Sequence, residues 1–217
     1  MNILSLFSGT GGLDSGFEKA GFKVTWANEF DKSIWKTYEK NFPKTKLDKR
    51  SIIDVNPNEL PECDGIIGGP PCQSWSEAGA LRGIKDQRGQ LFHNYVDFIK
   101  VKRPKFFLAE NVAGLLFNRH SAALDDIFEN FLKLGYNVSY QLLNTNDYGV
   151  PQSRKRVIIV GYPVSYGEHF LPPEKDLHKL TLKDAIFDLR KNAVPALDKN
   201  KANPKAKVPN HEYMLGG

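Results

Sequence analysis

The sequence has little cysteine, no long apolar run and only a small excess of positive charge. Its two cysteines, Cys63 and Cys72, are too few for a disulfide framework, which favours a reducing, cytoplasmic location. No stretch has the length of a membrane span or the pattern of a signal peptide, so we expect neither membrane insertion nor export. The net charge is +5, but a surplus of +3 lies in residues 191–217 and only +2 in the rest. Charge alone therefore does not identify a nucleic-acid-binding protein.

Residues 64–76 are the stretch around which the rest of the chain is organised. They read Asp64-Gly-Ile-Ile-Gly-Gly-Pro-Pro-Cys-Gln-Ser-Trp-Ser76. The two isoleucines predict a short buried strand, and the glycines and prolines predict a stiff turn that cannot continue a β-ladder. The turn would present Cys72 at the carboxyl end of a strand, where open α/β sheets bind ligands. A free cysteine is usually a small buried hydrophobe, but a core position has no need of this turn, so we favour a nucleophile.

The N-terminal residues predict the strand, glycine-rich loop and helix of a nucleotide-binding α/β fold. Residues 2–7 indicate a buried strand, and Ser8-Gly-Thr-Gly-Gly12 follows it. We expect Asp14 to cap the next helix at its N-terminus and Gly21 to end it. The loop matches neither the dinucleotide-binding spacing nor the P-loop, so by itself it is a weak signal.

The next segment strengthens this interpretation. Residues 23–28 predict a strand that ends in Glu29, the position at which such folds bind the hydroxyls of a ribose. Phe30, beside it, could stack on a purine ring. The alternative is that Glu29 is an acidic residue at the N-terminus of the helix that Asp31 begins. A third, poorly patterned strand is expected within residues 45–55.

The middle of the chain adds a second candidate for chemistry. Residues 74–89 are polar and punctuated by glycine, which is typical of a mobile lid over a site or of a plain surface loop. Residues 92–99 and 124–131 have apolar side chains at helical spacing and predict core-facing helices. Between them, residues 105–109 predict a strand that ends at Glu110. That carboxyl group could share or donate a proton, or could simply cap the next segment.

Two further strands are expected, near residues 138–143 and 157–161. The segment between them carries Arg154 and Arg156, which lie on the same side of an extended chain. Two guanidinium groups that face one way suit a phosphate or a carboxylate. The alternative is a basic strand edge in solvent.

Five motifs, in this order along the chain, resemble those of the DNA cytosine-5 methyltransferases. They are Phe7-Ser-Gly-Thr-Gly-Gly12, Asn28-Glu29, Pro71-Cys-Gln73, Glu110-Asn-Val112 and Gln152-Ser-Arg-Lys-Arg156. The stretches Gly68–Leu91 and Asn210–Tyr213 are similar to those of the bacterial restriction-modification enzymes that modify GGCC. The resemblance extends over the whole chain but includes only the N-terminal part of the family's pattern.

This resemblance implies a Rossmann-like class I methyltransferase fold, with a mostly parallel sheet and helices on both faces. It implies S-adenosylmethionine as the methyl donor, double-stranded DNA as the substrate and no metal ion. Glu29 would hold the ribose of the donor. The other donor-binding residues would be Phe7, Ser8, Gly9, Thr10, Gly11, Gly12, Leu13, Phe30, Ser51, Ile52, Pro70 and Leu91.

The resemblance also implies that Cys72 attacks C6 of a cytosine flipped out of the duplex, so that C5 can accept the methyl group. Glu110 would contact N3 and the exocyclic amine of the base. Arg156 would hold the flipped nucleotide, and Arg154 would brace Glu110. Four residues would have structural roles or belong to the lid, namely Gln73, Ser76, Arg82 and Gln152, and Asn111 would support the Cys72 turn.

The sequence departs from the family in two ways. Arg50 and Ser51 replace a Gly-Asp pair whose carboxylate accepts a hydrogen bond from the adenine amine. The target-recognition region and the motif that closes the donor pocket are absent, so we expect a catalytic domain of residues 1–190 and a polar segment, 191–217, that begins the missing region. Three hypotheses fit: a methyltransferase that needs a second polypeptide, an inactive remnant, or a non-catalytic nucleotide- or DNA-binding module.

Overall fold

The computed structural model describes residues 1–71, 87–117 and 121–192 of the chain. The chain divides into two compact units. The first consists of Met1–Asn144 and Lys155–Glu174, and it contains the whole β-sheet. The second consists of Thr145–Arg154 and Lys175–Gly217.

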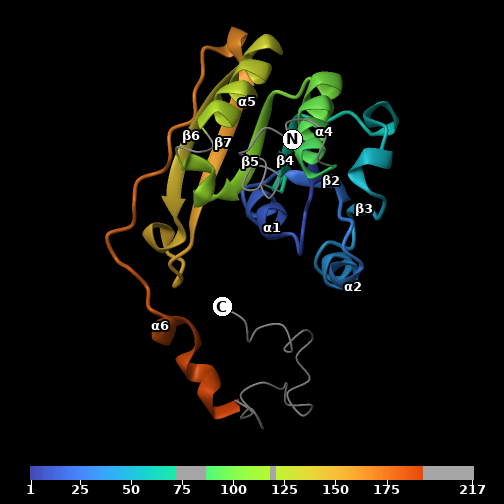
Figure 1. Cartoon of the computed structure of the whole chain (residues 1–217). Helices are drawn as coiled ribbons and strands as arrows, with labels where there is room; N and C mark the ends of the chain where they lie inside the picture. Colours follow the sequence, from blue (N-terminus) through green and yellow to red (C-terminus); the bar gives the residue numbers. More distant parts are fainter. Residues whose placement is uncertain (72–86, 118–120, 193–217) are drawn as a thin grey trace. The chain divides into compact units, whose positions relative to one another are not determined.

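The first unit is built on a seven-stranded sheet in the order β3-β2-β1-β4-β5-β7-β6 (Figure 1). Strands β1 to β5 run parallel, and β7 is antiparallel to both of its neighbours. The strands are β1 (Asn2–Leu6), β2 (Lys23–Asn28), β3 (Lys46–Asp48), β4 (Gly65–Gly68), β5 (Phe106–Val112), β6 (Tyr136–Asn144) and β7 (Lys155–Pro163). The strand expected within 45–55 is therefore only three residues long, and Ile52–Asp54 forms a 3-10 turn instead.

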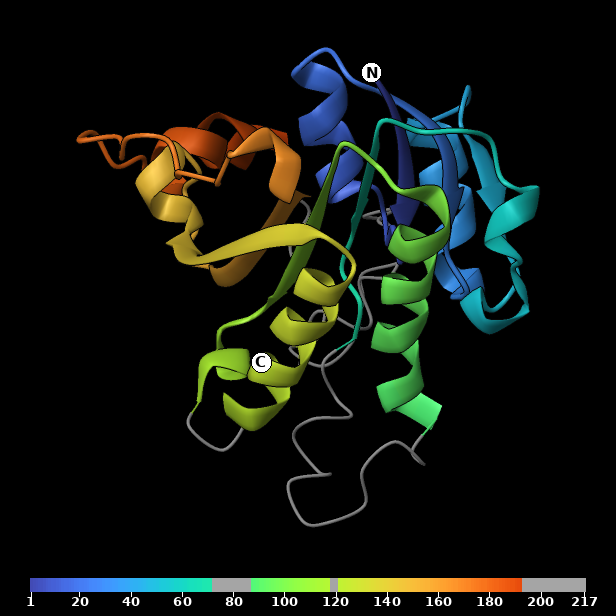
Figure 2. The same cartoon turned by 90° about the horizontal axis from the view of Figure 1, so that it is seen from above.

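Helices cover both faces of the sheet, which gives the predicted α/β architecture (Figure 2). Helices α1 (Gly12–Lys19) and α2 (Lys32–Asn41) lie on one face. Helices α4 (Gln87–Lys102) and α5 (Ser121–Lys133) lie on the other. Both core-facing helices predicted from apolar spacing are confirmed, because their apolar positions pack into the core around Leu4, Leu6 and Phe107.

Asp14 does not cap α1, contrary to the prediction. Gly11 occupies the N-cap position in the left-handed conformation, with φ of 87°, and provides no side-chain cap. Asp14 lies inside the first turn and is completely buried. Its carboxylate instead accepts hydrogen bonds from the hydroxyl groups of Ser5 and Tyr38. Glycine can start the helix here because it adopts positive φ without steric cost.

The second unit is held by local polar contacts. Its described elements are the 3-10 helices Thr145–Tyr148 and Phe187–Asn192 and the short helix α6 (Leu182–Ile186). Asp147 pairs with Lys175 at 3.1 Å and with Lys179 at 3.0 Å. Thr181 and Asp184 form a capping box at the start of α6. Across the described parts of both units, no helix combines the length and apolar character needed to cross a membrane.

The burial of Asp14 predicts a pH-dependent stability. Burial, with a smaller effect of Glu18, raises the pKa of Asp14 above its usual 3.8, although the hydrogen bonds from Ser5 and Tyr38 oppose the rise. The folded chain therefore binds this proton more strongly than the unfolded chain. The resulting stabilisation is complete below the unfolded pKa and is lost as the pH rises through the folded pKa. The free energy of unfolding, relative to that of Asp14→Asn, should fall as the pH increases above about 4, the usual pKa of an aspartate carboxyl group.

Urea unfolding at several pH values measures this difference. Asp31→Asn is the matched control, because hydrogen bonds from Ser33 lower the pKa of Asp31. Its contribution is present above the unfolded pKa and is lost as the pH falls, so the control difference should move in the opposite direction. A constant difference between the unmodified chain and Asp14→Asn would contradict the prediction.

Candidate functional site

The candidate site lies at the carboxyl ends of the parallel strands. The strand order reverses at β1, since β2 lies on one side of it and β4 on the other. Open α/β sheets bind ligands in the crevice at such a reversal. Here Phe7 follows β1, Glu29 follows β2, Gly69 follows β4, and Glu110 lies near the end of β5. The fold thus brings residues predicted from separate motifs to one edge of the sheet.

The loop after β1, residues Phe7–Gly12, has an unusual backbone. Phe7 is left-handed with φ of 54°, and Gly9 and Gly11 also have positive φ. Bulky residues rarely adopt this conformation, and such strain tends to occur at ligand sites. Gly11 also touches the ring of Phe42 so closely that a side chain there would overlap it. Only glycine satisfies both conditions at position 11.

Polar groups of this loop are partly satisfied by β2. The Ser8 amide donates to the carbonyl oxygen of Asn28 at 3.0 Å, and the Gly9 amide donates to Glu29 Oε2 at 2.8 Å. The Ser8 hydroxyl oxygen is buried and has no hydrogen-bond partner within the described parts of the chain. A buried polar atom of this kind calls for a ligand or water partner.

Glu29 lies at the N-terminus of α2, as the alternative interpretation expected, and it also contacts the glycine loop. Asp31 caps α2 by accepting from the Ser33 amide at 2.9 Å. Glu29 Oε1 accepts from the Asp31 amide at 2.7 Å, so the carboxylate bridges the cap residue and Gly9. Each carboxylate oxygen keeps a further lone pair, with which it can accept from a hydroxyl group. The neighbouring Phe30 is 67% exposed.

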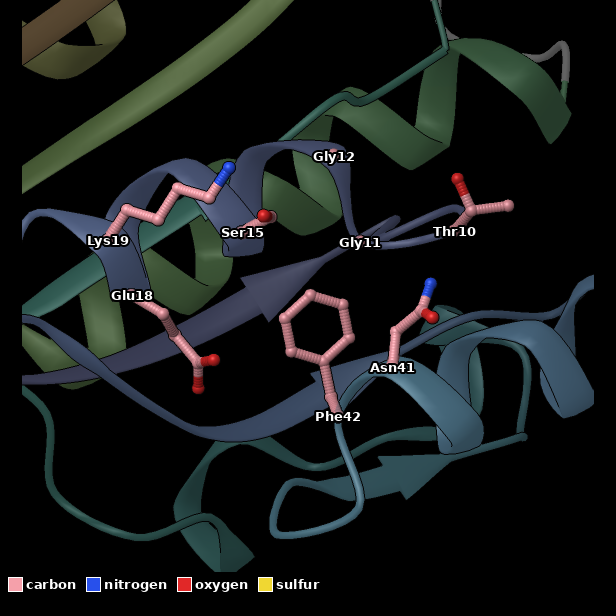
Figure 3. Close-up of a pocket in the computed structure, with 8 residues that line it drawn as sticks. All are labelled: Thr10, Gly11, Gly12, Ser15, Glu18, Lys19, Asn41 and Phe42. Carbon is pink, nitrogen blue, oxygen red and sulfur yellow. The ribbon is translucent and has the colours of Figure 1, made fainter. Parts of the chain in front are cut away.

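A pocket of about 720 Å³ lies beside the loop, on the α1 side (Figure 3). Its residues come from the loop, from α1 and from the end of α2: Thr10, Gly11, Gly12, Ser15, Glu18, Lys19, Asn41 and Phe42. Figure 3 shows the Phe42 ring next to Gly11, with Glu18 and Lys19 toward one end of the pocket. Glu29, Ile52, Pro70 and Leu91 do not line it. The pocket therefore shares the glycine loop with the predicted donor site but not its other residues.

The apolar residues predicted to contact the donor are largely packed in the core. Ile52 is 3% exposed, and Leu91 packs against the same cluster of side chains. Pro70 is buried. Leu13, in the first turn of α1, is partly buried and packs against the cluster that contains Ile3. These residues form the base and wall of the edge at which the loop lies.

The segment after β3 is fixed by contacts that the sequence analysis did not identify. The side-chain Nδ2 of Asn28 donates to the backbone carbonyl oxygens of Asp48 at 3.1 Å and Arg50 at 2.8 Å. The Arg50 guanidinium binds the Asp48 carboxylate, with Nη2 2.7 Å from Oδ2, and this hydrogen bond lowers the pKa of Asp48. Ser51 follows directly and precedes the 3-10 turn. Ser51 thus stands next to an arginine whose charge is already paired.

The turn after β4 is joined to the end of β5. The side-chain Nδ2 of Asn111 donates to the Pro70 carbonyl oxygen at 3.0 Å, and Asn111 Oδ1 accepts from the backbone N–H of Val112 at 2.8 Å. A Cβ on Gly69 would lie 3.5 Å from Glu110 Oε2, so the carboxylate rests over this glycine. Asn111 thus supports the turn that leads to position 72. Cys72, Gln73, Ser76 and Arg82 lie outside the described residues.

Glu110 is held by Arg156. Arg156 Nε lies 2.7 Å from Glu110 Oε1, and both side chains are about three-quarters buried. The antiparallel register places Arg156 opposite Val112, two residues beyond Glu110. The resemblance had assigned this bracing role to Arg154 and nucleotide binding to Arg156. The structure shows that Arg156 forms an ion pair with Glu110. Arg154 and Gln152 belong to the second unit, where their carbonyl oxygens accept hydrogen bonds from Thr145.

Comparison with known proteins identifies the family. The model of the C-5 cytosine-specific DNA methylases matches residues 1–215. The chain belongs to this family. It is 53% identical to the type II methyltransferase M.NgoPII of Neisseria gonorrhoeae and 54% identical to M.FnuDI of Fusobacterium nucleatum, over its full length. It spans 64% of the length of each of these relatives.

A solved structure agrees with this assignment. A candidate DNA modification methyltransferase encoded within an E. coli prophage is 32% identical and superimposes with a TM-score of 0.72. The match covers 86% of this chain and 54% of that protein. The resemblance inferred from the five motifs and the expected Rossmann-like class I fold are therefore confirmed.

Because β1 and β4 approach closely at Gly68, a methyl group added there should strongly lower the stability of the chain. A Cβ on Gly68 would overlap the carbonyl oxygen of Leu6, which is backbone and cannot rotate away. Gly68→Ala should therefore force the strands apart and lower the free energy of unfolding by about 1–3 kcal/mol. Gly16→Ala is the control, since apart from its chain neighbours and its own helix backbone no atom lies within 4 Å of its Cβ position.

Because Gly16 is inside α1, alanine there should stabilise the chain by about 0.5–1 kcal/mol through helix propensity. Urea unfolding of both variants tests the pair. Equal stabilities would show that the strands can separate at Gly68 without cost.

Proposed function

We propose that this chain is the catalytic part of a DNA cytosine-5 methyltransferase. The reaction is transfer of a methyl group from S-adenosylmethionine to C5 of a cytosine flipped out of double-stranded DNA. The observation that carries the proposal is the Glu110–Arg156 ion pair, which lies over Gly69 beside the turn that leads to Cys72. The glycine loop follows the adjacent strand β1, so donor and base would meet at one edge of the sheet.

The residues at this edge suit the proposed donor. Positions 9 and 12 face open space, and the buried Ser8 hydroxyl offers a hydrogen bond. Glu29 has lone pairs for two ribose hydroxyls, and the exposed Phe30 ring can cover one face of the adenine. Ile52, Pro70 and Leu91 provide apolar support. When bound, S-adenosylmethionine supplies an electrophilic methyl group on a sulfonium.

The protein residues then act on the base. The Cys72 thiolate forms a bond to C6, and the electron pair of the C5–C6 double bond becomes available at C5. Glu110 contacts N3 and the exocyclic amine, where it stabilises the charge that develops on the ring. Arg156 keeps this carboxyl group in position. Transfer of the methyl group to C5 would leave S-adenosylhomocysteine as the second product. Loss of the C5 proton to water and departure of the Cys72 thiolate would then restore the aromatic ring.

Flipping the base requires contacts beyond these. Removing a cytosine from the duplex costs a few kcal/mol, and contacts to DNA must offset this cost. The relatives that match at 53% and 54% identity extend beyond the matched part. We therefore propose that contacts from a target-recognition region, in addition to the residues described above, are needed for sequence-specific methylation, and that GGCC is the sequence recognised.

Cys72→Ser should abolish methyl transfer but leave donor binding within about two-fold, because serine is a far weaker nucleophile at the same position. Cys63→Ala is the control, since Cys63 packs against the core and burial raises its pKa to about 12. Transfer of labelled methyl to GGCC duplexes is measured with the chain alone and with a relative's target-recognition region added. Calorimetry measures donor binding.

We expect transfer only in the mixture, and only when Cys72 is present. Full activity of Cys72→Ser would exclude the covalent step. Specific methylation by the chain alone would exclude the need for the added target-recognition region. Donor binding without transfer in any mixture would favour a binding module, and no donor binding at all would favour a remnant.

Ser51→Asp should tighten donor binding, because a carboxylate accepts a stronger hydrogen bond from the adenine amine than a hydroxyl does. A gain of about 1–3 kcal/mol corresponds to about a five- to hundred-fold lower dissociation constant. Ser165→Asp, on an exposed 3-10 turn, adds the same charge elsewhere and should change nothing. Equal or weaker binding of Ser51→Asp in calorimetry would show that position 51 does not contact the adenine.

A further inference from the structure

A buried polar network lies directly behind the glycine loop. Asp14, Ser5 and Tyr38 are each 0% exposed. The Ser5 hydroxyl donates to Asp14 Oδ1 at 2.6 Å, and the Tyr38 hydroxyl donates to Asp14 Oδ2 at 2.5 Å. Burial and the adjacent carboxylate raise the pKa of Tyr38, so its hydroxyl remains a donor. Burying a carboxylate is costly unless its hydrogen bonds are satisfied, and here they join β1, α1 and α2.

The network reaches the loop through two aromatic rings. The Tyr38 ring stacks on Phe42, with centroids 4.8 Å apart and planes inclined by 30°. The Phe42 ring in turn occupies the space where a side chain at Gly11 would lie, as Figure 3 shows. Gly11 is held in the left-handed conformation at this contact. A continuous set of contacts therefore runs from Asp14 through Tyr38 and Phe42 to Gly11.

We propose that Asp14 is a positioning residue for the loop Phe7–Gly12. It fixes the loop from behind, because its two hydrogen bonds set the distance between β1 and α2 and hence the place of Phe42 against Gly11. Glu29 fixes the same loop from its other side through the Gly9 amide. An effect of Asp14 on the binding of S-adenosylmethionine rests on the proposed function, whereas its effect on the conformation of the loop does not.

Amide hydrogen exchange tests the effect on the loop without any ligand. The amides of Ser8, Gly9 and Gly11 each donate a hydrogen bond, so their exchange reports the loop conformation. Tyr38→Phe keeps the ring that stacks on Phe42 and removes only the hydroxyl. Ser5→Ala removes the other donor. Each variant should speed exchange of these amides about three- to ten-fold, as expected for the loss of one hydrogen bond.

Tyr136→Phe is the matched control. Its hydroxyl is also buried and donates to the Pro104 carbonyl oxygen at 2.7 Å, but it lies at the start of β6, away from the loop. It should lower the melting temperature by an amount similar to that of Tyr38→Phe and leave exchange of the three loop amides unchanged. If all three variants affect the loop equally, or if none does, Asp14 has only a general structural role and the inference is wrong.

Calorimetric titration with S-adenosylmethionine separates this inference from the proposed function. Tyr38→Phe and Ser5→Ala should bind the donor about three- to ten-fold more weakly than the unmodified chain, and Tyr136→Phe should bind it equally well. If the unmodified chain does not bind the donor, the proposed function fails, while faster loop exchange would still support the role of Asp14. Unchanged affinity together with unchanged exchange would overturn the inference.

Discussion

The hydrogen bond from Asn111 to the carbonyl oxygen of Pro70 joins the two strand ends on which the site depends. The turn after β4 contains two prolines, so it lacks two backbone donors and cannot be held by a ladder. The buried side chain of Asn111 instead holds the turn, through its hydrogen bond to Pro70. Since Glu110 is its neighbour in β5, one residue pair both fixes the turn and places the carboxylate over Gly69. The turn that leads to position 72 and the Glu110 carboxylate are therefore fixed by neighbouring residues of one strand.

The glycine loop is constrained in a different way, by contacts from two directions. Glu29 accepts from the Gly9 amide, and Phe42 fills the space beside Gly11. The contact at Gly11 requires the absence of a side chain, because the Phe42 ring fills that space. Gly9 bonds Glu29 through its backbone N–H, and glycine suits this position because its φ is positive. A glycine loop is expensive to order, because its unfolded state has high conformational entropy. Fixing it from β2 and α2 at once leaves its open side ready for a ligand.

The sequence allowed the strands, the core-facing helices and the edge that carries the site to be predicted, because apolar runs and glycine or proline punctuation are local signals. It misassigned Asp14, whose role as an acceptor depends on Ser5 and Tyr38 in other elements. The pairing of Glu110 was also missed, because it follows from the antiparallel register of β5 and β7. No pattern within one segment contains that register. Errors therefore arose where a polar side chain finds its partner in another element of the fold.

The ion pair between Glu110 and Arg156 has a further consequence for chemistry. A carboxyl group in a turn would have to be oriented when the base enters, and that ordering would oppose catalysis. Here the guanidinium on β7 holds one carboxylate oxygen, while the strand fixes the backbone on which the side chain stands. The remaining oxygen lies near Gly69, on the side of the turn that leads to Cys72. In the proposed reaction, the Glu110 carboxyl group would therefore be oriented before the cytosine enters. No free energy would then be spent on reorienting it when charge develops on the ring. Electrostatic stabilisation is most effective under this condition. Strand β7, whose antiparallel register no single segment of the sequence contains, thus carries the arginine that orients the Glu110 carboxylate.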